Sequence, residues 1–315
     1  MIMAQPATDL NVENDELKKQ VHAFWNAQSC DTQVAKAEQF SRAYFEEIEA
    51  FRYFDQPFIH SFAQFTRFRD RRVLEVGFGA GTDFIQWLRA GAQVTGVDLT
   101  EEALRNLSHR IQTYGLPAPE RLQIADAENL PFPDNSFDLA YSFGVLHHTP
   151  DTEKAIRELI RVVKPGGEIK LMLYNRRSVY VFNRWVKYAL GRGRPWKSLR
   201  WVLWNHNESL GTKGYSRREL EQIFSALPVE GLRIETQVTS GDYLSASALP
   251  PLNWLYRLGL MVAGQHFPWR PWHYVERAHS SESHPLGTNA TAGPEAVRSG
   301  NPLGFFHCIS ARKKM

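Results

Sequence analysis

The stretch VLEVGFGAGTD, residues 73–83, decides the fold. An apolar run that predicts a buried strand is interrupted by Glu75 and followed by Gly77, Gly79 and Gly81 at alternate positions. Such glycines let the backbone turn sharply and approach a ligand closely, with helix N–H groups directed at it. Dinucleotide-binding folds use a similar loop, but their G-x-G-x-x-G/A spacing differs from the G-x-G-x-G found here. The loop therefore predicts a ligand site and leaves the ligand open.

Strands and helices alternate on both sides of this loop. The chain contains five expected strands, RVLEV, AQVTGVD, RLQIA, FDLAYS and EIKLMLY, the last after a KPGG turn. Helices are expected at 82–90, opened by Thr82, at 101–115, capped by Thr100 and Gly115, and at 150–163. A further helix at 216–227 and two later strands, LRIETQVT and GFFHCISARKK, complete the pattern. This order predicts a doubly wound, Rossmann-like α/β fold with a mostly parallel seven-stranded sheet.

The composition changes on both sides of this central unit. We expect six regions, namely an N-terminal helical cap (1–70), a Rossmann-like cofactor-binding core (71–175), a basic aromatic lid insertion after the fifth strand (176–227), a sixth strand with an aromatic extension (228–277), a disordered linker (278–303) and a closing strand and tail (304–315). Helices at 14–28 and 41–68, the second divided at Pro57, are predicted for the cap. The linker is polar and rich in small residues and proline, so it has too little apolar surface to offset its chain entropy.

Charge and cysteine usage exclude several classes of protein. The net charge of +3 on 315 residues is too small to indicate nucleic acid by itself, although residues 176–218 hold eleven Lys or Arg against one acid, Glu208. No apolar run approaches the roughly 18–20 residues of a membrane span, and the first residues are polar and acidic rather than a signal peptide. Two distant cysteines, Cys30 and Cys308, indicate a reduced compartment without a disulfide framework or structural zinc site. We expect a cytoplasmic protein.

Two further acids follow the glycine loop at strand ends. Asp98 ends the second strand 17 residues after Gly81, where a carboxylate can accept both hydroxyls of an adenosine ribose. Asp126 follows the third strand, where it can accept a hydrogen bond from an adenine amino group. Each acid alone could be a strand-end cap, but together behind this loop they favour an adenosine ligand.

Four segments carry a family resemblance, namely VLEVGFGAG, VTGVDLT, DAENLPFPDNSFDLAYSFGVLHHTPD and LIRVVKPGGEIKLML. Together they resemble class I S-adenosylmethionine-dependent methyltransferases, especially the small-molecule branch that includes ubiquinone and menaquinone biosynthesis C-methyltransferases. The resemblance covers about residues 72–174. It implies that Glu75 and the three glycines hold the methionine end of the cofactor, Asp98 the ribose, Asp126, Ala127 and Leu99 the adenine, and that Phe143 lines the sulfonium. Glu75 would find its donors among the loop amides and the cofactor ammonium.

Other residues are candidates for the acceptor side. His148 could act as a general base and His147 could line the acceptor site, although both could instead organise the loop before the next helix. No metal is predicted, because adjacent residues in extended chain point opposite ways and no third ligand lies nearby in sequence. Tyr44 and Arg52 of the cap are candidates for lining the cleft, whereas Trp25 and Cys30 are expected to be an anchor and a buried thiol.

The sequence therefore predicts methyl transfer to a small, apolar or aromatic metabolite, on carbon or oxygen. Three alternatives stay open, namely a methyltransferase acting on tRNA or another macromolecule, an NAD-dependent oxidoreductase and an inactive binding module. The basic, tryptophan-rich block at 176–204 has three interpretations, as a lid over the acceptor, a membrane-surface contact or an RNA-facing patch. The fourth-strand segment SFGV lacks the Asn/Asp-Pro-Pro-aromatic signature of nucleic-acid amino-methylating enzymes, which makes nucleic acid the less favoured partner. The oligomeric state is left open.

Overall fold

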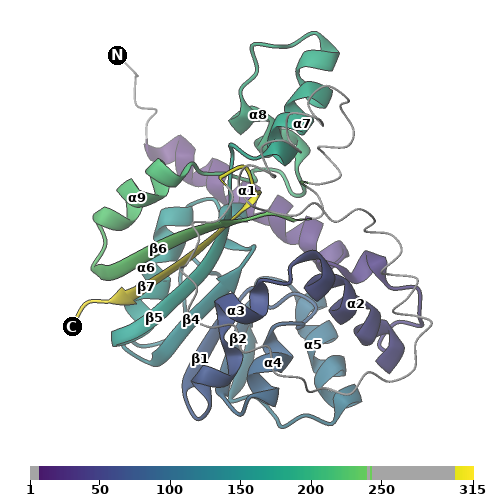
Figure 1. Cartoon of the computed structure of the whole chain (residues 1–315), viewed down its shortest axis with the longest axis vertical. Coiled ribbons are helices and arrows are strands. Elements are labelled where there is room, and N and C mark those ends of the chain that lie inside the picture. Colours follow the sequence, from purple (N-terminus) through teal and green to yellow (C-terminus); the bar gives the residue numbers. More distant parts are fainter. Residues whose placement is uncertain (1–6, 240–241, 243–301) are drawn as a thin grey trace, which may run out of the picture.

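A computed structural model describes residues 7–239, 242 and 302–315, and its centre is a seven-stranded sheet (Figure 1). The strands are β1 (Arg72–Val76), β2 (Gln93–Asp98), β3 (Arg121–Ile124), β4 (Phe137–Phe143), β5 (Val163–Tyr174), β6 (Val229–Gln237) and β7 (Phe306–Lys313). They lie in the order β3-β2-β1-β4-β5-β7-β6. Neighbours from β3 to β5 pair in parallel, whereas β7 pairs antiparallel with both β5 and β6. The predicted Rossmann-like, mostly parallel, seven-stranded fold is confirmed.

Helices cover both faces of the sheet and bury a separate apolar core on each. On one face, α4 (Phe84–Arg89) and α5 (Glu101–Tyr114) pack with the segment before β1, burying Trp87 and Leu107. On the other face, α6 (Thr152–Val162) and α9 (Arg217–Ser225) bury Leu159 and Phe224. A doubly wound sheet buried on both faces leaves its strand ends as the places where a ligand can enter.

The helix ends differ in part from the sequence prediction. Thr100 caps α5 through its hydroxyl, which accepts from the Ala103 amide at 3.3 Å, and Gly115 ends that helix at φ +61°, as expected. The predicted helix opened by Thr82 is shorter, because α4 begins at Phe84 and its N-cap is Asp83, whose side chain makes no capping bond. The KPGG segment is also not a separate turn, since β5 already begins at Val163.

The N-terminal segment folds as helices, as expected, and packs beside α5. Its elements are α1 (Ala7–Ala27), α2 (Arg42–Asp55) and α3 (Ile59–Ala63), with short 3-10 turns at Thr32–Val34 and Phe65–Phe68. Pro57 separates α2 from α3, whereas α1 begins earlier than the predicted residue 14. Both α1 and α2 contact α5, which brings the N-terminal helices to the carboxyl edge of the sheet.

The segment between β5 and α9 contains α7 (Val179–Tyr188), a 3-10 turn at Leu190–Arg192 and α8 (Leu199–His206). The two helices pack against each other and stand above one end of the sheet in Figure 1. Ser178 and Ser198 cap them by accepting from the Val181 and Trp201 amides. The linker expected at 278–303, apart from its last two residues, and nearly all of the aromatic extension expected up to 277 lie outside the described residues.

Candidate active site

A cavity of about 360 Å³ lies at the carboxyl ends of the central strands. Doubly wound folds bind ligands at this edge. One side of the cavity, called the loop wall below, consists of residues 75–80, 82–83, 98–100 and 125–127. Another part of the lining, called the lid wall, consists of His148, Tyr174, Tyr180, Glu208, Phe305 and Phe306. A second hollow, of about 540 Å³, is lined by residues such as Glu168 near the start of β5, away from that edge.

The glycine loop contributes two of its three glycines to the cavity. Gly77, Gly79 and Gly81 all have positive φ, at +79°, +50° and +74°, which favours glycine at each position. A Cβ on Gly79 would meet no atom within 4 Å, so the backbone there is bare toward the cavity. A Cβ on Gly81 would instead lie 2.5 Å from Leu107 of α5, and Gly81 is not among the cavity-lining residues. Gly81 therefore packs closely against α5, and its predicted cofactor contact stays a prediction.

Glu75 lies on the loop wall, 3% exposed, and has a donor that the sequence interpretation missed. The indole Nε1 of Trp87 donates to its carboxylate at 2.9 Å. Burial and the neighbouring Asp83 carboxylate raise the pKa of Glu75 well above its ordinary value. The indole thus supplies a hydrogen bond that had been expected from the loop amides and the cofactor.

Asp98 and Asp126 both reach the loop wall from adjacent strand ends. Asp98 accepts from the Gly79 amide at 3.0 Å and from the Thr100 amide and hydroxyl at 3.0 and 2.9 Å. Burial raises the pKa of Asp98, and these donors oppose that shift. Asp126 accepts from the Glu128 amide at 2.9 Å and forms an ion pair of 2.6 Å with Lys18 of α1. Helix α1 therefore reaches over the position predicted for the adenine.

Leu99, Ala127 and Phe143 also line the cavity, as their predicted roles require. Leu99 directly follows Asp98 in the chain, and Ala127 directly follows Asp126. Phe143 is 8% exposed at the end of β4, with the Arg52 guanidinium 5.1 Å from its ring centroid. The structure brings these three residues to the same cavity as the glycine loop.

Arg52 lines the cavity, but its guanidinium is held by two buried acids. Its Nη2 and Nε atoms lie 2.6 and 3.0 Å from the Asp83 carboxylate, and Asp31 lies 3.4 Å away. Tyr141 donates a further hydrogen bond to Asp83 at 2.9 Å. Burial alone would raise the pKa of Asp83, but Arg52 outweighs it and holds the pKa below its ordinary value. Asp83, read from the sequence as a helix-dipole acid, is instead the anchor of α2.

Two predicted acceptor-side residues do not line this cavity. Tyr44 is 5% exposed, packs against Ala80 and lies 3.3 Å from Asn106 through its hydroxyl. His147 is fully buried and packs on Tyr174, with 3.7 Å between ring centroids. Burial lowers the pKa of His147 well below its ordinary value. The sequence could not distinguish these positions, because an aromatic helix face and a loop histidine are compatible with both a core and a cleft.

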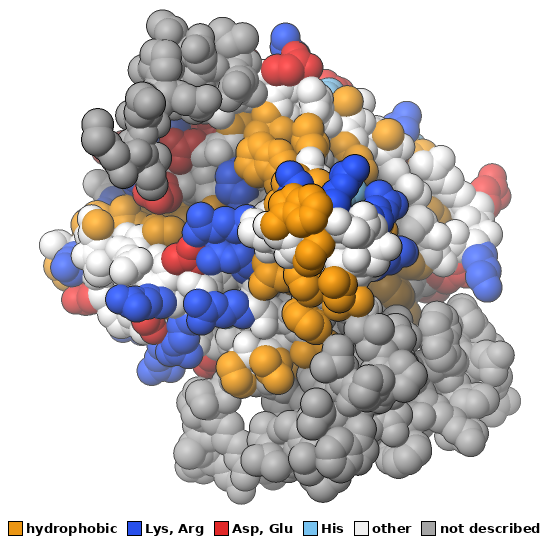
Figure 2. Space-filling model, turned by 90° about the horizontal axis from the view of Figure 1, so that it is seen from above, with side chains coloured by type: hydrophobic (Ala, Val, Ile, Leu, Met, Phe, Trp, Pro, Cys, Tyr) orange, Lys and Arg blue, Asp and Glu red, His pale blue; other side chains and the backbone are white. Residues whose placement is uncertain are grey.

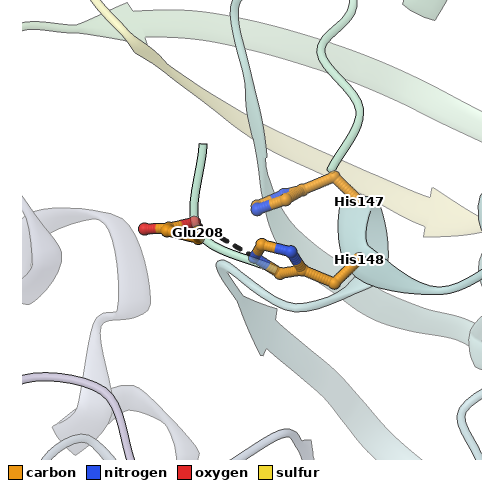
Figure 3. A group of neighbouring side chains, drawn as sticks. All are labelled: His147, His148 and Glu208. Atoms are coloured by element: carbon orange, nitrogen blue, oxygen red, sulfur yellow. Dashed lines mark ion pairs between the residues drawn. The ribbon is translucent and has the colours of Figure 1, made fainter. Parts of the chain in front are cut away.

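His148 lies on the lid wall within a polar group. Its Nδ1 is 3.0 Å from the Ser209 hydroxyl and 3.1 Å from the Thr212 hydroxyl, and its Nε2 is 3.4 Å from the Glu208 carboxylate (Figure 3). Trp25 packs edge-on against the ring at 5.1 Å between centroids. The Glu208 carboxylate therefore lies beside the His148 ring, and the general-base role of His148 stays a prediction.

Cys30 differs from its expected role as a buried thiol. Its side chain is exposed and lines the cavity, as does Trp25. Lys18, Asp83 and Glu208 were missed as cavity residues. Glu208 could have been found from the sequence, since it is the one acid among eleven basic residues in 176–218.

None of the helices in the described ranges has the length and apolar character that a membrane crossing needs.

Comparison with known proteins identifies the central unit. Residues 74–171 match the family model described as "Methyltransferase domain". The 27-O-demethylrifamycin SV methyltransferase of Amycolatopsis mediterranei is 35% identical over 101 residues, which are 32% of this chain and 37% of that protein. The ubiquinone/menaquinone biosynthesis C-methyltransferase UbiE of Azotobacter vinelandii is 34% identical over 114 residues, 35% of this chain and 45% of that protein. The alignments span between about a third and a half of the relatives matched here.

Solved structures agree with the fold. The phospholethanolamine N-methyltransferase 2 of Haemonchus contortus, in complex with phosphomonomethylethanolamine and S-adenosylhomocysteine, superposes with a TM-score of 0.53 at 16% identity. The superposition covers 94% of this chain and 61% of that chain. The predicted methyltransferase resemblance is confirmed for residues 74–171, and S-adenosylmethionine is the cofactor that this domain indicates.

Proposed function

We propose that this chain, whose residues 74–171 match a methyltransferase domain, transfers a methyl group from S-adenosylmethionine to a small, largely apolar metabolite, on carbon or oxygen. One observation carries the proposal. A bare glycine loop, Glu75, Asp98 and Asp126 all line one cavity at the carboxyl edge of the sheet. Acids at these three places suit an adenosine with an amino-acid tail better than the pyrophosphate of a dinucleotide, which would add negative charge beside them.

Several residues of the loop wall have a role in this proposal. Gly77, Gly79 and Glu75 would hold the methionine end, and Asp98 the ribose hydroxyls. Asp126, Ala127 and Leu99, which stand at strand ends, would hold the adenine, with Phe143 beside the sulfonium. The cofactor carries the reactive methyl, so the protein's task is to align donor and acceptor and to exclude water.

The acceptor would lie against the lid wall, because that wall is aromatic. Tyr174 stacks on Phe305 at 4.1 Å between ring centroids, and Tyr180 lies 4.4 Å from Phe305. Such rings form a wall suited to an apolar substrate. Relatives named for a rifamycin and for ubiquinone or menaquinone support a polyketide-like or quinone-like acceptor.

We also propose that the α7–α8 segment contacts an anionic membrane surface. Phe182, Leu190, Trp196 and Trp204 are exposed there, Trp196 at 74%. Figure 2 shows an apolar ridge with Lys and Arg side chains beside it on this upper face. Interfacial contacts combine apolar insertion with basic side chains in this way. Co-sedimentation with vesicles containing phosphatidylserine should exceed that with phosphatidylcholine vesicles, and Trp196→Ser should reduce it; equal sedimentation would refute the contact.

Calorimetry and a labelled-cofactor panel test the function. S-adenosylhomocysteine should bind and NADH should not, and labelled methyl should pass to quinols, phenols or polyketides rather than to tRNA. Tight NADH binding without S-adenosylhomocysteine would refute the methyltransferase assignment, and transfer to tRNA alone would refute the small-molecule acceptor. If His148→Ala methylates a phenolic acceptor as fast as the unmodified chain, His148 does not act on that acceptor.

A further inference from the structure

Three potential metal ligands converge at the lid wall. One nitrogen from each of His147 and His148 and one oxygen of Glu208 all lie within 4.8 Å of one another. Both objections that the sequence raised against a metal are removed. Residues Leu146–His148 form a 3-10 turn, so the adjacent rings converge at 4.3 Å between centroids, and Glu208 supplies the third ligand from beyond α8. Figure 3 shows both rings directed from one short helix toward Glu208.

The hydrogen bonds of His148 fix which nitrogen carries its proton. The Thr212 hydroxyl donates to the Ser209 carbonyl at 2.7 Å, so its oxygen can only accept at His148 Nδ1, 3.1 Å away. The Ser209 hydroxyl, 3.0 Å from the same nitrogen, can accept as well. A protonated Nδ1 therefore satisfies both contacts, and the Nε2 of the neutral ring carries a lone pair. Metal-binding histidines are oriented in the same manner, by donating their other N–H.

That lone pair faces a second acceptor. His148 Nε2 lies 3.4 Å from the Glu208 carboxylate without forming a hydrogen bond in the described part of the chain. The Tyr174 hydroxyl donates to the two oxygens of Glu208 at 3.1 and 2.9 Å, which holds the carboxylate in place. A lone pair and a carboxylate held this close repel each other unless a cation lies between or beside them.

His147 is the strongest sign of a missing partner. Its side chain is 0% exposed, and neither ring nitrogen has a hydrogen-bond partner among the described residues. Buried polar groups without a partner cost free energy and are uncommon in folded proteins. A ligand that accepts electron pairs would satisfy His147, His148 and Glu208 together.

We propose that His147, His148 and Glu208 bind a divalent transition-metal ion of the zinc type. Two imidazoles and one glutamate form a ligand set used by catalytic zinc sites. Ligand atoms in a tetrahedral zinc site lie about 3.4 Å apart, so the widest separation in the group, which is at most 4.8 Å, needs to shrink by up to about 1.4 Å. Since His148 and Glu208 line the cavity, a further coordination position would meet water or an oxygen of the acceptor. That last point rests on the proposed function, whereas binding of the metal does not.

The test measures metal directly. The full chain is treated with chelator, dialysed and titrated with Zn²⁺ by calorimetry, and with Co²⁺ by visible absorption. One ion per chain should bind, and Co²⁺ should give d–d bands of a four- or five-coordinate site. Loss of an outer-shell partner typically weakens metal binding about 10–100-fold, so Glu208→Gln and His148→Gln, which remove ligands, should weaken it at least as much. The matched control is His22→Gln, because His22 pairs with an acid, Glu101, on the exposed surface.

Absence of stoichiometric Zn²⁺ binding, or affinity unchanged in both Glu208→Gln and His148→Gln, would overturn the proposal. Circular dichroism and thermal melting show whether each variant is folded, and Glu208→Gln keeps the shape of a side chain that is 34% exposed. S-adenosylhomocysteine titrations of the same samples separate the two claims. Zinc binding without S-adenosylhomocysteine binding would refute the proposed function alone, and the reverse would refute the metal site alone.

Discussion

The two walls of the cavity are built in different ways. The loop wall comes from three successive strand ends within residues 75–127, and backbone amides hold its acids in place, as the Gly79 amide holds Asp98. The lid wall collects residues from His148 to Phe306, and ring packing such as that of Tyr174 on Phe305 holds it together. A wall made from local turns can be read from a motif, whereas a wall made from distant rings depends on the whole fold.

The largest expected effect concerns the ion pair that fastens α2 to the loop wall. Arg52→Ala should lower the free energy of unfolding by about 3–5 kcal/mol, because it leaves Asp83 charged and buried at 3% exposure. Urea denaturation measures the change. Arg42→Ala on the same helix removes an exposed ion pair with Glu46. This variant should change the free energy of unfolding by less than about 1 kcal/mol. Equal effects of the two variants would show that the loop wall does not depend on α2.

A pair of glycine variants separates stability from binding within the loop wall. Gly77→Ala should cost about 2–3 kcal/mol of stability, since its Cβ would lie 2.1 Å from Val145 at φ +79°. Gly79→Ala should cost about 1 kcal/mol, because no atom lies within 4 Å, but it should weaken S-adenosylhomocysteine binding. Melting temperatures and calorimetry of both variants measure this. Undiminished binding by folded Gly79→Ala would show that the ligand does not approach that backbone.

Matched acid variants on the two walls test where the cofactor binds. Asp98→Ala should weaken S-adenosylhomocysteine binding by about 1–3 kcal/mol, because it removes a charged acceptor. Glu208→Gln on the lid wall should leave that affinity nearly unchanged. Calorimetry on both variants decides. Unchanged affinity of Asp98→Ala would reduce Asp98 to a strand-end cap for Thr100.

The smallest expected effect is a pH dependence of the support behind the lid wall. Glu219 of α9 pairs with Arg176, at 2.7 Å, and with Arg200 of α8, and it closes a capping box with Ser216. Burial alone would raise the pKa of Glu219, but the Ser216 and Arg176 contacts outweigh it and lower the pKa to about 2. A lowered pKa gives stability that is present above about pH 4.5 and is lost as the pH falls toward 2.

Unfolding free energies measured between pH 5 and 2 should therefore fall less steeply in Glu219→Gln than in the unmodified chain. Glu221→Gln, on the same helix with an exposed pair to Arg217, serves as the control. Parallel pH profiles for the unmodified chain and Glu219→Gln would show that this carboxylate contributes no pH-dependent support.

The sequence predicted the sheet and most of the loop wall because both follow from local patterns. Alternating strands and helices, positive-φ glycines and strand-end acids need no knowledge of distant contacts. Trp87 beneath Glu75 and Lys18 beside Asp126 were missed because each reaches its partner through the tertiary fold. The prediction that no metal binds assumed that His147 and His148 lie in an extended chain. That premise is wrong, because Leu146–His148 form a 3-10 turn.

The acceptor-side predictions were weaker for a related reason. Tyr44 and His147 were placed at the cleft by residue type, but tertiary packing buries both side chains, and neither is among the residues that line the cavity. Cys30 was assigned to the core by the same logic and is exposed to the cavity. Residue type indicates what a side chain can do, whereas its neighbours from other elements decide where it is.

The position of β7 between β5 and β6 has a consequence for biosynthesis. β6 emerges from the ribosome first, but in this sheet it pairs with β7, which follows after roughly 70 residues. At about 5–20 residues per second, that interval lasts roughly 3–14 s. Until β7 arrives, the backbone edge of β5 lacks the strand that covers it in the finished sheet, and unpaired edges are sites of aberrant association. The nascent chain therefore passes through a stage in which the five parallel strands β1 to β5 form a sheet whose β5 edge is unpaired, and this stage ends when β7 pairs with β5.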